Sequence, residues 1–174
     1  MNKQTQPTRR LFFACWPDKR IRGEIVERRR LVEGLSRRQV PDHNLHLTLL
    51  FLGNQPADRL SGLVEAADGL EAPGFALQLD RFGWFPAARV AWLGGPAPAV
   101  AQALVRALSE RCGGLGLRFD RRRFHPHVTL FRKLERRPAF PPVPVLDWSV
   151  GEFALIESIP SRPYQVLRTW PLRM

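Results

Sequence analysis

Two tetrapeptides of the same form, His46-Leu47-Thr48-Leu49 and His127-Val128-Thr129-Leu130, occur in the 174-residue sequence. Each belongs to a short apolar stretch that is typical of a β-strand. Because residues i and i+2 of a strand share a face, the histidine and the threonine of each tetrapeptide should point to the same side. The apolar residues between them point to the other side, where they can pack against helices. We therefore expect the histidines and threonines to face a cleft.

Outward from these tetrapeptides, the hydrophobic periodicity predicts alternating strands and helices. The expected strands are 11–16, 44–52, 75–82, 89–93, 127–132, 150–158 and 164–170, and the expected helices are 17–35, 57–70 and 99–111. Two pairs of strands, 75–82 with 89–93 and the last two of the chain, are predicted to be hairpins. Each half of the chain contains a helix, an arginine-bearing connection and a His-x-Thr-Leu strand, which suggests an internal duplication. If a pseudo-twofold axis relates the halves, both His/Thr pairs converge on one ligand.

The chain is strongly basic, with 27 Lys plus Arg against 16 Asp plus Glu and a net charge of +11. Such a balance attracts polyanions, of which nucleic acid is the most common, although a solvated basic surface would have the same composition. Arg37 and Arg38 precede the first tetrapeptide, and residues 121–123 are three arginines before the second. Both clusters are candidate contacts for RNA phosphates.

Cysteine usage and the length of the apolar runs indicate a soluble cytoplasmic protein. Cys15 and Cys112 have no neighbours at CxxC spacing, so free thiols in a reducing compartment are expected. No apolar run approaches the length of a membrane span. Residues 1–8 are predicted to be a flexible tail and residues 9–174 to be a single domain.

All four histidines, His43, His46, His125 and His127, lie in or just before the two strands. Histidine has an unperturbed pKa near neutrality and suits both a general base and a general acid. Threonine hydroxyls can donate to the charge that develops on phosphate oxygens. Two His-x-Thr units thus supply what phosphodiester cleavage needs without a metal. A zinc site is the alternative use of these histidines, but Asp42 is the one carboxylate beside the first pair, and metal-independent chemistry is expected.

At these residues the chain resembles the two-histidine (2H) phosphoesterase superfamily, and within it the bacterial RNA 2′,3′-cyclic phosphodiesterases, also called 2′-5′ RNA ligases. The matching segments span nearly the whole chain: 11–14, 46–53, 82–86, 89–92 and 126–132, with Ser158 and Tyr164 at the place of a closing Ser…Tyr strand pair. Residues 160–163 depart from the family pattern, which often has a glycine there.

The resemblance implies an α+β fold of two pseudo-symmetric lobes, with antiparallel sheets facing a central cleft and helices on the outside. It implies hydrolysis of RNA 2′,3′-cyclic phosphate ends to 2′-phosphomonoesters without a cofactor, with 2′-5′ ligation of RNA as a reverse reaction. By the same resemblance, His46 is the proton donor and His127 the proton acceptor, with Thr48 and Thr129 binding the phosphate. The implied partner is RNA with cyclic-phosphate or tRNA-like ends, bound by a monomer.

Five further residues are candidate RNA contacts: Arg123, Arg132, Trp84, Phe85 and Tyr164. Trp84 and Phe85 are expected in an exposed hairpin loop at 83–88, where aromatic rings can stack on a base. Arg132 has the opposite strand parity to His127, so a regular strand would direct its side chain away from the cleft. By the same parity, Phe51 is expected in the core.

Two other functions fit the same residues. A non-catalytic RNA-binding module would use the basic cleft without turnover. A 2H phosphodiesterase for small nucleotides, such as ADP-ribose cyclic phosphate or 2′-5′ oligoadenylate, would use the same histidines on another substrate. A panel of substrates separates these readings.

Overall fold

The computed structural model describes residues 6–173, so positions 1–5 of the predicted tail lie outside the described residues. The first strand already begins at Thr8. The elements in chain order are β1 (Thr8–Cys15), α1 (Lys19–Arg30), β2 (Arg38–Gln39), η1 (Asp42–Asn44), β3 (Leu47–Pro56), η2 (Ala57–Arg59), α2 (Leu60–Asp68), β4 (Phe75–Leu79), β5 (Arg81–Phe85), β6 (Val90–Gly94), α3 (Ala99–Gly114), β7 (His127–Arg132), β8 (Leu146–Val150), β9 (Glu152–Glu157) and β10 (Gln165–Pro171).

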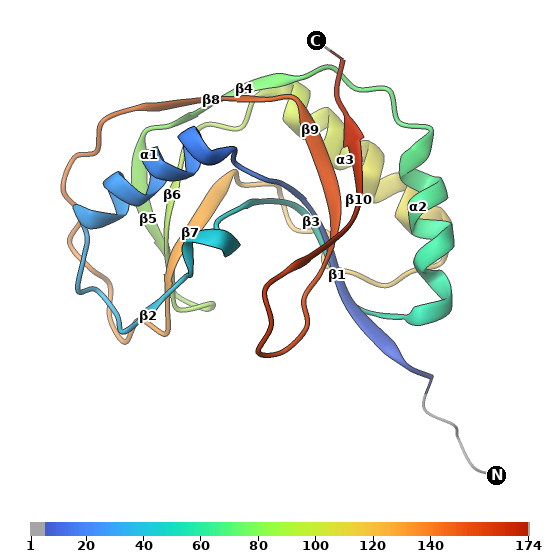
Figure 1. Ribbon diagram of the computed structural model, residues 1–174, viewed down its shortest axis with the longest axis horizontal. Helices are drawn as coiled ribbons and strands as arrows, with labels where there is room; N and C mark the ends of the chain where they lie inside the picture. Colours follow the sequence, from blue (N-terminus) through green and yellow to red (C-terminus); the bar gives the residue numbers. More distant parts are fainter. Residues whose placement is uncertain (1–5, 174) are drawn as a thin grey trace.

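Over residues 6–173, the strands form one large sheet in the order β10-β9-β1-β3-β7-β6-β5, with β2 against β7, and a small sheet of β4 and β8. Every ladder between named strands is antiparallel, and three α-helices accompany them, which confirms the α+β class. Figure 1 shows α1 over the strands β5 to β7, while α2 and α3 lie on the side of β9 and β10. The helices lie on the outside, as expected.

The large sheet divides at its centre into two lobes. We call β1, β3, β9 and β10 the first lobe, and β2, β5, β6 and β7 the second. Between β3 and β7, the register in the described chain contains one Cα pair, Leu47 opposite Val128. These are the middle residues of the two His-x-Thr sequences, so the junction of the lobes lies beside both histidines.

Local interactions of residues 18–34 explain where helix α1 begins and ends. The Asp18 side chain accepts a hydrogen bond from the Ile21 amide at 2.7 Å, which caps the first turn. Ile21 and Ile25 are buried on the core side. The helix ends at Arg30, earlier than the expected residue 35, and Leu31 from the predicted apolar stripe is 50% exposed. Gly34, with φ of +86°, then reverses the chain.

The first predicted hairpin was wrong in its partners. Residues 75–79 alternate as expected, but β4 pairs with β8 in the small sheet. At Asp80 the chain crosses from the small sheet to the large sheet, and the Asp80 amide donates to the Gly94 carbonyl. Strand β5 then pairs with β6. Residues 83–85 therefore belong to a strand and not to the predicted loop, and the turn is confined to residues 86–89, with Arg89 at φ +55°. Periodicity within a strand carries no information about which strand lies beside it.

A β-bulge follows the threonine of the first His-x-Thr sequence. In the pairing of β3 with β1, Thr48 lies opposite Ala14 and Leu50 opposite Phe13, so Leu49 has no partner. One extra residue reverses the side-chain alternation beyond it. Phe51 consequently joins the face of Thr48, which corrects its expected place in the core.

The second His-x-Thr sequence is followed by a bulge at the equivalent position. In the pairing of β7 with β6, Thr129 lies opposite Trp92 and Phe131 opposite Ala91, so Leu130 is the extra residue. Arg132 is thereby returned to the face of Thr129. The strand parity that separated Arg132 from His127 in the sequence does not hold in the fold.

Gly95 marks the place where the small sheet meets the large one. A Cβ atom built on it would lie 1.7 Å from the Gln78 carbonyl oxygen, which is backbone and has little freedom to move. Gly23, in the middle of α1, is exposed and has nothing within 4 Å of such an atom. A side chain at position 95 would therefore clash with backbone, whereas one at position 23 would meet no neighbouring atom within 4 Å.

We expect Gly95→Ala to destabilise the protein by about 1–3 kcal/mol or more, because backbone must shift to admit the methyl group. Gly23→Ala should stabilise it by roughly 0.5–1 kcal/mol, because alanine loses less conformational entropy in a helix. Urea unfolding followed by circular dichroism measures both. Equal stability of the two variants would show that the junction at Gly95 tolerates a side chain.

Candidate active site

A cleft of about 700 Å³ lies between the two lobes. Both His-x-Thr pairs open onto it, so His46 and Thr48 of the first lobe face the same space as His127 and Thr129 of the second. The predicted convergence of the two strands on one site is present in the fold.

Each histidine is oriented by the carbonyl group two residues before it. His46 Nδ1 lies 2.7 Å from the Asn44 carbonyl oxygen, and His127 Nδ1 lies 2.6 Å from the His125 carbonyl oxygen. A carbonyl oxygen only accepts, so Nδ1 carries the hydrogen in both rings. This leaves Nε2 of each ring for chemistry, and His46 Nε2 lies 3.0 Å from the Thr48 hydroxyl. In both rings, the same type of hydrogen bond to the backbone holds Nδ1 and leaves Nε2 as the reactive nitrogen.

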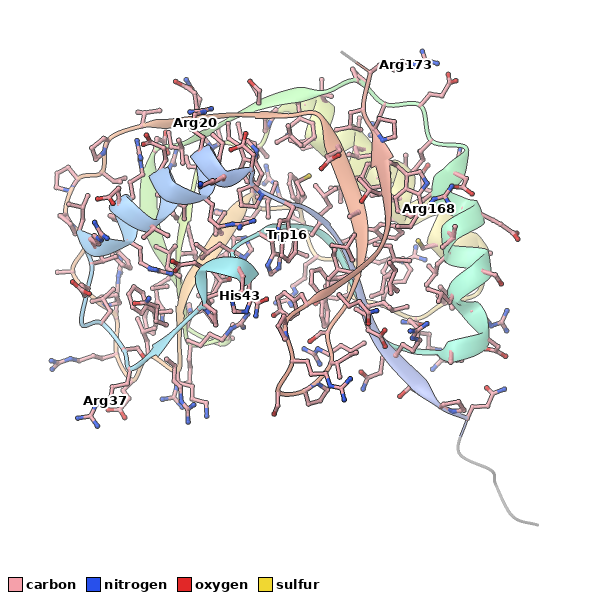
Figure 2. All side chains as sticks on the ribbon, in the orientation of Figure 1. Trp16, Arg20, Arg37, His43, Arg168 and Arg173 are labelled. Carbon is pink, nitrogen blue, oxygen red and sulfur yellow. The ribbon has the colours of Figure 1, made fainter. Side chains whose placement is uncertain are left out.

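Aromatic rings enclose His46 on several sides. The Trp16 ring is stacked on it with centroids 5.5 Å apart and planes 9° from parallel, and Phe12 lies at 5.0 Å. Tyr164 presents an edge at 5.3 Å, and its amide donates to the Asn44 side chain. Figure 2 shows Trp16 beside the centre of the fold, well away from the labelled surface arginines. Sequence reasoning missed Trp16, which reads as the last residue of an apolar strand.

His127 has different neighbours. Phe85 meets its ring edge-on at 5.0 Å, and the Trp92 and His125 rings lie at 6.1 and 6.0 Å. His125 also lines the cleft. Among residues 6–173, no aromatic ring is stacked parallel on His127 as Trp16 is on His46.

Burial lowers the pKa of both histidines. The pKa of His46 falls to about 4, mainly through desolvation, with the positive charges of Arg132 and His127 acting in the same direction against the Asn44 carbonyl. Desolvation also lowers the pKa of His127, and His125 and Arg132 add to the effect. At neutral pH, His46 without a bound anion is therefore uncharged. An anion in the cleft favours the protonated ring and shifts this pKa upward.

The other predicted contacts divide between the cleft and the core. Phe85, Tyr164, Arg123 and Arg132 line the cleft, as does Ser158. Trp84 does not, because it alternates with Phe85 along β5 and packs against the main core. Its expected exposure in a loop was wrong.

The two arginine clusters of the sequence also lie differently from each other. Arg122 and Arg123 line the cleft, and Arg122 is paired with Asp120 at 2.5 Å. Arg37 and Arg38 are exposed and stand outside the cleft lining. His43 lies in η1 and is also absent from that lining.

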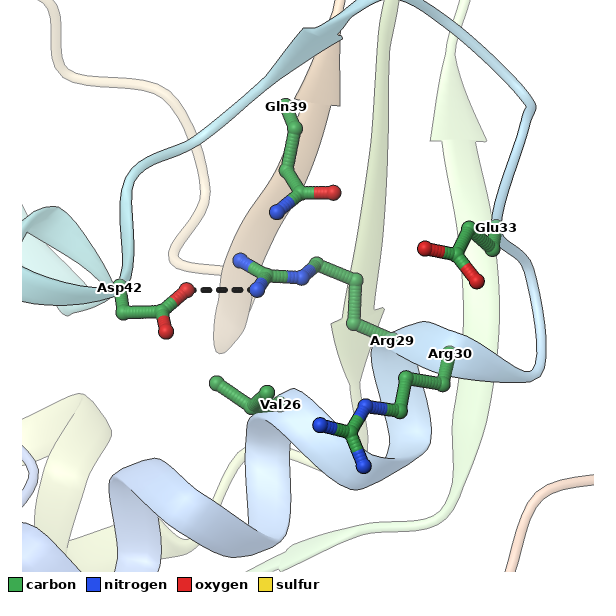
Figure 3. Close-up of a pocket in the computed structure, with 6 residues that line it drawn as sticks. All are labelled: Val26, Arg29, Arg30, Glu33, Gln39 and Asp42. Carbon is green, nitrogen blue, oxygen red and sulfur yellow. Dashed lines mark hydrogen bonds and ion pairs between the residues drawn. The ribbon is translucent and has the colours of Figure 1, made fainter.

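A tether from α1 holds the segment that leads into His46. The buried Arg29 guanidinium donates to the Val40 carbonyl at 2.9 Å and pairs with Asp42 at 2.5 Å. Figure 3 shows this pair at a small second cavity of about 250 Å³. Because Asp42 begins η1, the tether fixes the turn from which His46 enters the cleft.

Within residues 6–173, no group of three His, Cys, Asp or Glu side chains is arranged to hold a metal ion. The two free cysteines are buried, and burial raises the pKa of Cys112 to about 11 and that of Cys15 further. The thiols therefore stay protonated at neutral pH. No helix of the described chain has both the length and the apolarity needed to cross a bilayer.

The fold and the paired His-x-Thr strands define the class of two-histidine phosphoesterases. The chain belongs to the 2′-5′ RNA ligase superfamily, whose family model matches residues 17–159. It is 37% identical over 171 residues to the RNA 2′,3′-cyclic phosphodiesterase of Escherichia coli K12, covering 94% of this chain and 96% of that protein. The protein of the same name from Thermus thermophilus is 36% identical, with 94% and 90% covered.

A solved structure has the same fold over its whole length. The crystal structure of E. coli LigT complexed with 3′-AMP superposes with a TM-score of 0.88 and 34% sequence identity. The match covers 97% of this chain and 100% of that chain. The two-lobed α+β architecture is thus shared with an experimentally determined relative.

The lowered pKa of His46 predicts the pH at which this ring becomes protonated. In phosphate-free buffer, we expect His46 to take up a proton only as the pH falls towards about 4. Inorganic phosphate bound in the cleft should move this protonation to higher pH, because its charge stabilises the imidazolium. Nitrogen-15 NMR of the imidazole rings across a pH titration, with and without phosphate, measures the shift. A His46 pKa near 6.5 in the free protein would contradict the expected desolvation.

Proposed function

We propose that the protein hydrolyses the 2′,3′-cyclic phosphate ends of RNA to 2′-phosphomonoesters, with His46 as general acid and His127 as general base. The convergence of two Nδ1-anchored histidines on one cleft is the observation that carries this proposal. The names of the relatives that align over nearly the whole chain support the substrate class.

In the proposed reaction, water attacks phosphorus while His127 Nε2 accepts its proton. The bond between phosphorus and the 3′ oxygen breaks, and His46 Nε2 gives its proton to that oxygen. The products are a free 3′ hydroxyl and a 2′ phosphate. His127 leaves the step protonated and His46 neutral, so a proton must pass through solvent before the next turnover. If the 5′ hydroxyl of a second RNA end takes the place of water in the same forward steps, the two ends are joined through a 2′-5′ bond.

Burial lowers the pKa of both histidines, but their aromatic neighbours differ in a way that supports the two roles. An acid must begin protonated, and the face of the Trp16 ring stacked on His46 favours a cation once phosphate offsets desolvation. A base must begin neutral, and among residues 6–173 no ring is stacked parallel on His127 to favour its protonated form.

Two threonines and one arginine stabilise the negative charge that develops on the phosphate. Thr48 and Thr129 stand two residues after their histidines on the same face, where their hydroxyls are within reach of the non-bridging oxygens. Arg132, brought to that face by the bulge at Leu130, adds a positive charge at the cleft wall. No step of this scheme requires a metal ion.

We infer an RNA substrate and not a small nucleotide alone, because the net charge of +11 suits a polyanion. Buried free thiols in Cys15 and Cys112 support a reducing, cytoplasmic compartment.

We expect His46→Ala and His127→Ala each to slow hydrolysis of RNA with a 2′,3′-cyclic phosphate by about a hundredfold to ten-thousandfold, since each removes one proton-transfer partner. His43→Ala is the matched control, because this exposed histidine lies outside the cleft lining, and it should retain activity. Chromatography of the product ends measures the rates and identifies the 2′ phosphate. Full activity of either cleft variant would refute the proposed site.

A substrate with a far better leaving group than a ribose hydroxyl separates the two roles. Such a group departs without a proton, so the His46→Ala defect should shrink while the His127→Ala defect persists. Equal defects on both substrates would overturn the assignment of acid and base, although the site itself would stand.

We also expect exhaustive dialysis against EDTA to leave the rate unchanged, because two imidazoles supply the acid and base. The control is the same dialysis followed by added zinc or magnesium. Loss of activity that only a metal restores would replace the proposed mechanism with a metal-dependent one.

A further inference from the structure

A group of cations without acidic partners lies at one end of the second lobe. We call it the basic ridge, and it consists of Arg37, Arg38, Arg89, Arg132, Lys133, Arg136 and Arg137. All seven side chains are exposed. The ion pairs found within residues 6–173 involve other arginines of the chain. Glu135 is the one carboxylate in the segments that form the ridge.

Three segments that are distant in the sequence build the ridge. Strand β2 pairs with the end of β7, which sets Arg38 opposite Arg132. The Ser36 hydroxyl donates to the Arg132 carbonyl at 2.7 Å and fixes the approach. The turn between β5 and β6 joins them through two hydrogen bonds between Arg89 and Leu134, at 2.9 and 3.0 Å. The cations are therefore held on anchored backbone.

The pairing of Arg38 with Arg132 is unfavourable by itself. Residues directly opposite each other in an antiparallel pair share a face and lie close, and like charges there destabilise the sheet. A phosphate group between two guanidinium groups removes that repulsion and accepts hydrogen bonds from both. This juxtaposition indicates an anionic ligand rather than a merely solvated surface.

The ridge is continuous with the cleft. Arg132 belongs to both, and Ala87 and Ala88 of the turn that ends at Arg89 also line the cleft wall. Among the other arginines that line the cleft, Arg122 is paired with Asp120. Figure 2 shows Arg37 at the far end of the lobe from Arg20 of α1. A chain leaving the cleft past Arg132 thus reaches this end of the lobe.

We propose that the RNA strand on the 5′ side of the cyclic phosphate leaves the cleft past Arg132 and binds along the basic ridge through its phosphates. This rests on the proposed function and specifies its substrate class as oligonucleotides, which reach the ridge, in preference to cyclic mononucleotides, which do not. Arginine suits the role because its planar fork matches phosphate oxygens.

The test removes two charges from the ridge and two from elsewhere. The variant Arg37→Gln/Arg38→Gln alters exposed ridge residues that stand outside the cleft lining. Its control, Arg20→Gln/Arg106→Gln, makes the same change in net charge on the exposed faces of α1 and α3. For each protein, kcat/KM is measured on a short oligoribonucleotide with a 2′,3′-cyclic phosphate and on a 2′,3′-cyclic mononucleotide, across a range of salt concentrations.

We expect the ridge variant to lose about threefold to thirtyfold in kcat/KM on the oligonucleotide and nothing on the mononucleotide. Its dependence of log(kcat/KM) on log[salt] should become shallower by about 1.4, which corresponds to two lost phosphate contacts on a single strand. The control variant should match the wild type on both substrates. An equal loss in the control, or no loss in the ridge variant, would overturn the ridge as the binding path.

Direct binding keeps this test separate from the proposed function. Fluorescence anisotropy with a single-stranded RNA that ends in a 3′ hydroxyl needs no turnover. If the wild type hydrolyses neither cyclic substrate, the proposed function fails, yet weaker binding by the ridge variant alone would still support the ridge. If hydrolysis proceeds and this binding is the same in all three proteins, the ridge inference fails by itself.

Discussion

The large sheet joins its two lobes through one backbone pairing, between Leu47 of β3 and Val128 of β7. Both residues stand between a histidine and a threonine, so joining the strands there brings the two His/Thr pairs to the same opening. On either side of this pair the strands pair with other partners, β1 in one lobe and β6 in the other. Strands β3 and β7 thus separate, and make room for a ligand, next to the position where their one pairing aligns the catalytic groups.

The pseudo-symmetry of the site is close in its backbone and broken in its side chains. Each lobe repeats the carbonyl that orients Nδ1 and the bulge after the threonine. The residue three places after each threonine then differs, with Phe51 in the first lobe and Arg132 in the second. Phe51 packs with an aromatic-rich cluster and under Arg10, whereas Arg132 carries a charge into the cleft. A duplicated backbone therefore presents two chemically distinct walls to one substrate.

Much of the fold could be predicted because its strongest signals are local. The strand at 127–132 has the predicted bounds, and the alternation at 75–79 is buried and exposed in turn as expected. The partner of β4 could not be predicted, because the periodicity of a strand is satisfied by any apolar surface. The bulges at Leu49 and Leu130 are also silent in the sequence, since both residues are leucines in apolar runs. The wrong hairpin gave Trp84 a loop setting, the bulges gave Phe51 and Arg132 the wrong face, and Trp16 was overlooked.

The bulges also limit how these strands tolerate changes in length. An extra residue that reverses the alternation acts like a shift of reading frame for the side chains that follow it. Removal of Leu130 would take away the bulge itself and leave Phe131 opposite Ala91 and Arg132 on the face of Thr129, whereas a regular strand that kept Leu130 would turn Arg132 towards the interior. Substitutions among apolar residues preserve the frame, whereas an insertion, or a deletion that leaves the bulge in place, does not. A relative that lacks one residue at either bulge can therefore keep the same cleft wall with a regular strand.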